Sequence, residues 1–335
     1  MDYFRRAPFS TGGPRGHKEW HHFCILAPHV DLLVNFSLAE DVRSGARDRT
    51  ELPRLTVLVR DASWDGDVDV FDPQDIDVAG GQIDTHFGRN RLQFHDGAYR
   101  ISFALQDRPI SGELELRPLT FPALAPNIPL PEGPPLHWVI VPRLSASGHV
   151  TVAGDQHRFT RVPAYHDHNF GHFLWGHAFS WIWGFCLPSR AAAPWSFAFV
   201  RLSNRSRTCA LAQGLFLWRG PHISRVFRED DLELRMSLQT LQLERVFKIP
   251  RPMALLSPEA QPDVPELVEL HADADGDSLD LRFAAQDLAQ VVIPSETDLS
   301  VTIINEVTGR AVVHGRIRGE SIDVDGRAIC EFLSV

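Results

Sequence analysis

The sequence predicts an all-β protein built from two consecutive antiparallel barrels. Apolar and polar residues alternate with a period of two along much of the chain, turn dipeptides recur at short intervals, and long helical periodicity is missing. About twenty short strand-like segments at regular spacing are typical of barrels and sandwiches. With 335 residues, the chain is long for one β-barrel and sufficient for two domains.

The alternation is clearest in residues 99–105, 113–117 and 232–238, where every second residue is apolar. Such a strand buries one face and exposes the other. Turns are expected at five dipeptides between the strand-like segments: Asp65-Gly66, Gly80-Gly81, Asp96-Gly97, Gly276-Asp277 and Asp325-Gly326. The last of these predicts a terminal hairpin between residues 315–319 and 328–332.

A boundary between the two domains is expected near residues 175–190, which gives an N-terminal barrel of residues 1–178 and a C-terminal barrel of residues 179–335. Two proline-rich stretches interrupt the alternation. Residues 121–135 contain six prolines and residues 250–265 contain five, so neither stretch is expected to form a central strand.

Composition and charge narrow the range of partners. The net charge is -10 and no basic stripe is visible, so we expect no nucleic-acid partner. No apolar run approaches the roughly 18 residues of a membrane span. We therefore predict no integral membrane segment, and any contact with a membrane would be transient. The N-terminal residues MDYFRRAPFSTGG lack the apolar core of a signal peptide. The sequence therefore predicts a cytoplasmic protein.

Known cofactor and catalytic motifs are missing from the sequence. There is no G-x-S-x-G elbow, no Walker loop and no convincing dinucleotide fingerprint, which argues against hydrolases, kinases and nicotinamide dehydrogenases. The four cysteines form no C-x-x-C motif and have apolar neighbours, so we expect buried thiols rather than a zinc site or disulfides. We predict no cofactor.

The densest group of ionisable side chains lies in residues 164–171, which read AYHDHNFG. Aromatic residues surround this segment on both sides: Trp138, Phe170, Phe173, Trp175, Phe179, Trp181 and Trp183. The segment is therefore the candidate site.

In an extended strand, Tyr165, Asp167 and Asn169 share one face, and His166 and His168 share the other. We assign the first set to the cavity side and the histidines to the supporting side. In an aromatic cavity, burial would raise the pKa of the Asp167 carboxyl and favour a neutral acid. The alternative is a structural aspartate that binds backbone N–H groups.

If the histidines face inward instead, they could bind a metal ion together with His172 or His177. However, H-x-H matches arise easily in a chain with 16 histidines, so we predict no metal.

Several short segments occur together in an order that resembles a known superfamily. These are Glu19-Trp20, Gly97-Ala98-Tyr99, Val141-Pro142, Ser147-Gly148, the segment Tyr165 to Gly171, and Trp181-Ile182-Trp183-Gly184. They resemble the lipocalin-like superfamily of carotenoid 1,2-hydratases (hydroxyneurosporene synthases) and lipocalin-like Diels–Alderases. The resemblance implies two tandem lipocalin-like (calycin) barrels and a hydrophobic small-molecule substrate.

In the carotenoid hydratases an aspartate protonates a terminal isoprenoid double bond and water captures the cation. By this resemblance the catalytic residues are Asp167, Tyr165, His137 and Trp138. Two departures weaken the transfer of hydratase activity: His137 and Trp138 are adjacent rather than separated by one residue, and Phe170 stands where tryptophan is common. The residues expected to bind the substrate are Trp20, Asn169, Phe170, Trp175, Trp181 and Trp183.

Three functions remain open at this point. The first is a lyase that hydrates a polyene or isoprenoid by acid catalysis. The second is a Diels–Alderase-like cyclase of a natural-product pathway, which folds a flexible polyene into a reactive conformer. The third is a carrier that holds a hydrophobic ligand without changing it.

Overall fold

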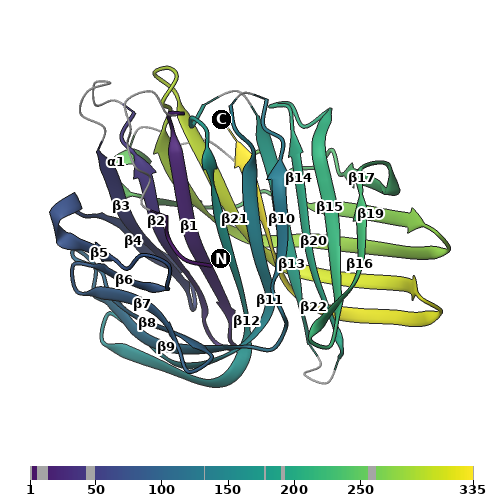
Figure 1. Cartoon of the computed structure of the whole chain (residues 1–335), viewed down its shortest axis with the longest axis horizontal. Helices are drawn as coiled ribbons and strands as arrows, with labels where there is room; N and C mark the ends of the chain where they lie inside the picture. Colours follow the sequence, from purple (N-terminus) through teal and green to yellow (C-terminus); the bar gives the residue numbers. More distant parts are fainter. Residues whose placement is uncertain are drawn as a thin grey trace. The chain divides into compact units, whose positions relative to one another are not determined.

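The computed structural model describes residues 2–5, 14–42, 50–131, 133–176, 179–189, 193–255 and 262–334. Almost all regular structure within these ranges is antiparallel β-sheet, which confirms the predicted class (Figure 1). The chain divides into two compact units, residues 1–174 and residues 175–335. Each unit has its own sheet and its own apolar core.

The sheet of the first unit has 12 strands among the described residues, in the order β4-β3-β2-β1-β12-β11-β9-β8-β7-β6-β5, with β10 pairing to β11. The strands are β1 (His17–Leu26), β2 (Asp31–Glu40), β3 (Glu51–Arg60), β4 (Trp64–Val70), β5 (Ile76–Val78), β6 (Asp84–Phe87), β7 (Asn90–His95), β8 (Ala98–Ala104), β9 (Ile110–Pro118), β10 (Ala123–Ile128), β11 (Leu136–Val152) and β12 (Asp155–His172).

The sheet of the second unit has 10 strands among the described residues, in the order β16-β15-β14-β13-β22-β21-β20-β19-β17, with β18 pairing to β20. Its elements are β13 (Ser180–Pro188), β14 (Trp195–Ser203), β15 (Ala210–Arg219), β16 (His222–Arg228), β17 (Leu232–Met236), β18 (Phe247–Ile249), the short helix α1 (Arg251–Ala254), β19 (Leu267–Ala274), β20 (Asp277–Pro294), β21 (Val301–Ile317) and β22 (Glu320–Ser334). None of the helices in the described ranges is long and apolar enough to cross a membrane.

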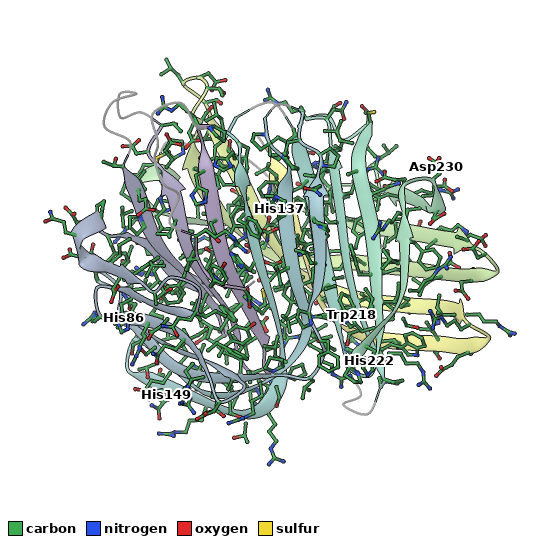
Figure 2. All side chains as sticks on the ribbon, viewed as in Figure 1. His86, His137, His149, Trp218, His222 and Asp230 are labelled. Carbon is green, nitrogen blue, oxygen red and sulfur yellow. The ribbon has the colours of Figure 1, made fainter. Side chains whose placement is uncertain are left out.

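Alternation explains why each sheet rolls around a core. In the first unit, strands from both ends of the sheet send every second side chain into one apolar cluster, including Phe23 of β1, Val57 of β3, Leu92 of β7 and Leu116 of β9. A single sheet can bring all of these side chains together only if it curls on itself. Figure 2 shows how densely side chains fill the two units.

The first and last strands of each unit pair with each other: β1 with β12 in the first, and β13 with β22 in the second. Figure 1 shows β1 beside β12. In the first unit this pairing sets His21 opposite His168 and His22 opposite Asp167. The pairing of β1 with β12 therefore positions the candidate site.

Two of the five predicted turns are wrong. Asp65-Gly66 lies inside β4 and Asp325-Gly326 lies inside β22. Gly66 and Gly326 instead allow the backbone of the neighbouring strand to pass close by, because a Cβ on either would lie 2.1 Å from a carbonyl oxygen of that strand. The terminal hairpin turns at Arg318-Gly319, where both residues have positive φ. Asp96-Gly97 is a true turn, with φ of 52° and 72°.

The cysteine prediction is correct for Cys24, Cys186 and Cys330, which are buried, and wrong for Cys209, which is exposed. Cys209 lies just before β15, where the loop side chain points to solvent rather than into the core. Among its described residues, the proline-rich stretch 121–135 contributes one strand, β10, which lies off the main strand order. The second proline-rich stretch contains α1, and its residues 256–261 lie outside the described residues.

Candidate functional site

The segment AYHDHNFG lies at the end of β12, between β1 and β11. As expected for an extended strand, its odd and even side chains point to opposite faces of the sheet. The even face continues from Val162 and Ala164, which belong to the apolar core of the first unit. His166 and His168 therefore lie on the inner face of the rolled sheet, and Tyr165, Asp167 and Asn169 lie on its outer face.

This result corrects the assignment made from the sequence. We expected the odd set on the cavity side and the histidines on the supporting side. In the first unit the histidine side chains point into the interior, because they lie on the same face of β12 as the core residues Val162 and Ala164. The odd set is nevertheless buried, since Tyr165 is 0%, Asp167 2% and Asn169 8% exposed.

Asp167 is the centre of a short hydrogen-bonded row on the outer face. The Tyr165 hydroxyl donates to Asp167 Oδ2 at 3.0 Å, and the Asn169 amide Nδ2 donates to Asp167 Oδ1 at 3.0 Å. Each donor is two residues from Asp167 along the strand, which is the spacing that places side chains on one face. Both carboxyl oxygens are thus held by neighbours on the same strand.

The environment of Asp167 favours a proton-carrying carboxyl. Burial raises the pKa of Asp167 to about 6, and polar contacts with Trp138 and Tyr165 limit the rise. Trp138 on β11 is 1% exposed and lies opposite Asn169. A carboxyl with such a pKa keeps its proton about half of the time near pH 6, unlike an ordinary aspartate. The structure therefore brings together Asp167, Tyr165 and Trp138, three of the four residues named as catalytic by the resemblance.

Residues of β1 complete this face, which we call the Asp167 face: Trp20, His22, Trp138, Tyr165, Asp167 and Asn169. His22 lies opposite Asp167, and its ring nitrogens contact Cys24 Sγ at 3.0 Å and the Asn35 amide at 3.3 Å. Burial lowers the pKa of His22 to about 3, so its imidazole is neutral. His22 is not among the residues predicted for the site, because its position opposite Asp167 depends on the register between two strands far apart in the chain.

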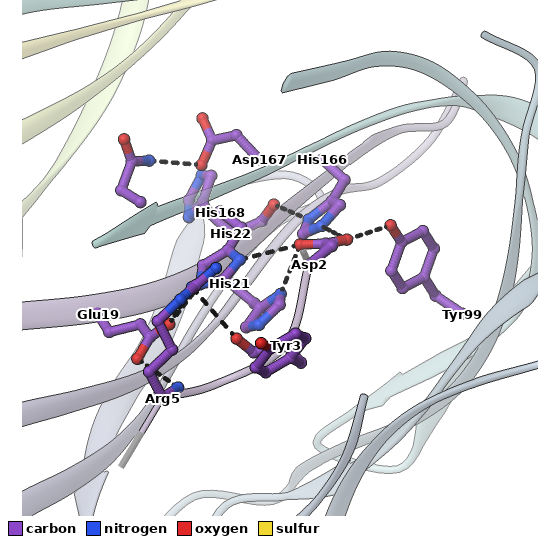
Figure 3. A network of polar contacts seen from close by, with 11 residues as sticks. Asp2, Tyr3, Arg5, Glu19, His21, His22, Tyr99, His166, Asp167 and His168 are labelled. Atoms are coloured by element: carbon purple, nitrogen blue, oxygen red, sulfur yellow. Dashed lines mark hydrogen bonds and ion pairs between the residues drawn. The ribbon is translucent and has the colours of Figure 1, made fainter. Parts of the chain in front are cut away.

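The inner face carries a second polar group, the histidine cluster of His21, His166 and His168 around Asp2 (Figure 3). His168 Nδ1 lies 3.0 Å from Asp2 Oδ1, and His166 Nε2 lies 3.2 Å from Asp2 Oδ2. The His21 and His168 rings stack at 4.0 Å. Asp2 precedes β1 and reaches the interior together with Phe4, which is packed in the core.

Carboxylates and a phenol support the histidine cluster. His168 Nε2 contacts Glu19 Oε1 at 2.8 Å, and the Tyr99 hydroxyl donates to Asp2. Burial acts to raise the pKa of Asp2, but contacts with the histidines hold it well below the usual carboxyl value. Burial also lowers the pKa of His21 well below its ordinary value. An ionised carboxylate thus lies beside a neutral imidazole in the interior.

The structure separates other predicted site residues from Asp167. His137 on β11 (labelled in Figure 2) stacks on Phe170 at 4.7 Å, and both lie on the inner face with the histidine cluster. The Arg5 guanidinium covers the Phe170 ring at 3.7 Å. Trp20 and Asn169, in contrast, lie on the Asp167 face, opposite each other in the β1–β12 register.

The remaining predicted aromatic residues belong to the second unit. Trp175, Trp181 and Trp183 are buried there, and the Trp175 and Trp181 rings lie 5.6 Å apart. Of the other candidate metal ligands, His172 ends β12 and its ring lies 5.3 Å from His17, apart from the histidine cluster. His177 lies outside the described residues.

The second unit contains a partly open apolar pocket among the side chains of its sheet. Aromatic and aliphatic side chains line it together with two thiols, among them Cys186, Phe199, Leu270, Phe283 and Cys330. Burial raises the pKa of Cys186 to about 12, so this thiol is neutral. Such a lining suits an uncharged, apolar guest.

Solved structures share this fold over nearly the whole chain. A protein assigned as AttH from Nitrosomonas europaea is 14% identical with a TM-score of 0.62, and the match covers 98% of this chain and 96% of that one. CghA in complex with Sch210972 is 13% identical with a TM-score of 0.64, over 96% of this chain and 89% of that one. Kievitone hydratase from Nectria haematococca is 12% identical with a TM-score of 0.58, over 98% of this chain and 93% of that one.

The lipocalin-like fold expected from the resemblance is confirmed. At these identities the likeness is one of fold, and it extends across both units. Comparison of the sequence with protein-family models and with curated proteins gives no match.

Proposed function

We propose that this chain is an enzyme that hydrates a terminal carbon–carbon double bond of a hydrophobic polyene or isoprenoid, with Asp167 as the acid. One observation carries the proposal: a fully buried carboxyl is held on both oxygens by Tyr165 and Asn169, and burial raises its pKa to about 6. A carboxyl tuned in this way suits general acid catalysis. The shared fold with kievitone hydratase gives support by analogy.

The proposed reaction conserves every atom. The Asp167 proton adds to one carbon of the double bond, and the π electrons form the new C–H bond. The cation left on the more substituted carbon is attacked by a water oxygen. The oxonium ion then returns a proton to the Asp167 carboxylate, which regenerates the acid and releases an alcohol. The net change is alkene plus water to alcohol.

The neighbours of Asp167 have separate roles in this proposal. Tyr165 and Asn169 position the carboxyl through their hydrogen bonds. The indole of Trp138, on the same face, stabilises the cation through its π-system, an effect worth about 2 kcal/mol or more in a desolvated site. His137 has no part near the acid, because it lies on the other face of the sheet beside Phe170.

The test is incubation with acyclic isoprenoid polyenes in ¹⁸O-water. The wild-type chain should release an alcohol that is heavier by one water and carries the label. Asp167→Asn should abolish this product while keeping the shape of the side chain, and Asp84→Asn, at a partly exposed carboxyl in β6, is the matched control. An unlabelled product with the mass of the substrate would sink hydration.

A cyclase is the second candidate, and it is supported by the sequence resemblance to the lipocalin-like Diels–Alderases; CghA, crystallised with Sch210972, shares the fold. Such an enzyme acts by holding its substrate in a reactive conformer, so proximity provides most of the rate. It predicts an unlabelled, mass-conserving product and activity that largely survives Asp167→Asn. The carrier alternative relies on the apolar pocket of the second unit, and it predicts that every ligand is recovered unchanged.

A further inference from the structure

Asp2, His21 and His168 bring three metal-ligating atoms close together in the interior of the first unit. These atoms all lie within 4.8 Å of one another. His168 Nδ1 is 3.0 Å and His21 Nδ1 is 3.6 Å from the same oxygen, Asp2 Oδ1. Around a tetrahedral zinc ion, with bonds of about 2.0–2.2 Å, neighbouring ligand atoms are about 3.3 Å apart. The two separations lie on either side of that value.

The ring orientations match those of histidines that bind a metal ion. Metal-bound histidines usually donate their other N–H group to a carboxylate or a backbone carbonyl. His168 turns Nε2 to Glu19 Oε1 at 2.8 Å, which leaves Nδ1 directed at Asp2. His166 turns Nδ1 to the backbone oxygen of His22 at 3.0 Å and Nε2 to the second Asp2 oxygen at 3.2 Å. His166 therefore steadies the carboxylate.

His21 gives an independent indication of a ligand. Its side chain is 0% exposed, and neither of its ring nitrogens makes a hydrogen bond within the described residues. The ring packs between Phe4, at 4.5 Å, and His168, at 4.0 Å. Buried polar groups in proteins are nearly always satisfied. A metal ion beside Asp2 would satisfy the nitrogen that points there.

We propose that Asp2, His21 and His168 bind a divalent transition-metal ion, with Zn²⁺ as the reference ion. Two imidazoles and one carboxylate suit zinc, iron(II) or cobalt(II), whereas Mg²⁺ and Ca²⁺ prefer oxygen ligands. The ion links residues 2–5, through Asp2, with strands β1 and β12. The site lies on the inner face of the sheet, so it is distinct from the Asp167 face and does not depend on the proposed hydration.

The direct test uses the full chain, stripped with a chelator and then titrated with Zn²⁺. We expect one equivalent to remain bound through gel filtration, measured by elemental analysis, and a rise in the midpoint of thermal unfolding. Excess Mg²⁺ should not displace the zinc, and Co²⁺ should bind with a visible absorption band of imidazole coordination. A chain that retains no zinc, or that loses it to Mg²⁺, would overturn the proposal.

Variants locate the site. His21→Ala and Asp2→Ala should each abolish retention of zinc, and Glu19→Gln should weaken affinity by about 10–100-fold, because Glu19 orients His168. His86→Ala removes a partly exposed histidine of β6 and should bind zinc like the wild type. Binding that survives both ligand variants would place the zinc elsewhere and refute the site. Asp2 precedes the first strand, so its variant keeps the test decisive if His21→Ala fails to fold.

Failure of this proposal can be told apart from failure of the proposed hydratase. Asp167→Asn should remove hydration and leave zinc retention at one equivalent, because Asp167 faces away from the cluster. Loss of zinc retention in Asp167→Asn that still folds would show that the two faces act as one site, which contradicts the present assignment.

Discussion

Asp167 and His168 are consecutive residues of β12, yet their side chains lie on opposite faces of the sheet. Asp167 accepts hydrogen bonds from Tyr165 and Asn169 on the outer face. His168 contacts Asp2 and Glu19 on the inner face (Figure 3). One strand thus carries two separate polar networks with only the backbone between them.

The hydrogen bond from Tyr165 to Asp167 should be measurable as a coupling between the two side chains. Tyr165→Phe leaves one oxygen of a buried carboxyl without its donor, so the free energy of unfolding should fall by about 1–3 kcal/mol in urea denaturation. In a double-mutant cycle, Tyr165→Phe should cost less in an Asp167→Asn background. Additive costs would show that the hydrogen bond contributes nothing to stability.

Phe4 should anchor the segment before β1. Its side chain is 2% exposed and packs in the core of the first unit, so Phe4→Ala should lower the free energy of unfolding by about 3–5 kcal/mol. Phe121→Ala is the matched control, because Phe121 is 60% exposed and its replacement should lower the free energy of unfolding only slightly. Equal effects of the two variants in thermal or urea denaturation would mean that the segment does not pack as described.

Gly326 should tolerate no side chain. A Cβ there would lie 2.1 Å from the carbonyl oxygen of Leu187 and 3.0 Å from Cys186 Sγ, so Gly326→Ala must force β22 away from β13. We expect the free energy of unfolding to fall by at least about 1–3 kcal/mol, the usual cost of overpacking. Gly80→Ala, where a Cβ would meet nothing within 4 Å, should be nearly neutral. A stable Gly326→Ala variant would contradict the close strand contact.

Thiol labelling should distinguish the cysteines. Cys209 is exposed, whereas Cys24, Cys186 and Cys330 are buried, and burial raises the pKa of Cys186 to about 12. Since the thiolate is the reactive form, a colorimetric disulfide reagent at mildly alkaline pH should label one thiol in the native chain and four in denaturant. Cys209→Ser should remove the native signal. Rapid labelling of a second thiol would show that the core opens.

Local patterns were sufficient to predict the fold class and the strand that carries the site. Alternation marks β8, β9 and β17 directly, and it places Tyr165, Asp167 and Asn169 on one face of β12. The resemblance added Trp138, which the structure sets on the same face. What failed were the choices that depend on neighbouring strands. Asp65-Gly66 and Asp325-Gly326 look like turns, but the glycines are needed where another backbone passes.

The histidine cluster could not be predicted because its members lie far apart in the chain. Asp2, His21 and Tyr99 meet His168 only through the pairing of β1 with β12 and the packing of the segment before β1. The one available signal was the apolar row of Val162 and Ala164, whose continuation points His166 and His168 inward. Following that row would have given the correct face.

The pairing of β1 with β12 also has a consequence for synthesis of the chain. β1 emerges from the ribosome long before its partner exists, so one edge of that strand has no neighbour while the intervening strands are made. Contacts of such large sequence separation form slowly. Both polar networks include residues of β12, so neither can form before that strand has been made, and a chain truncated before β12 would leave one edge of β1 unpaired.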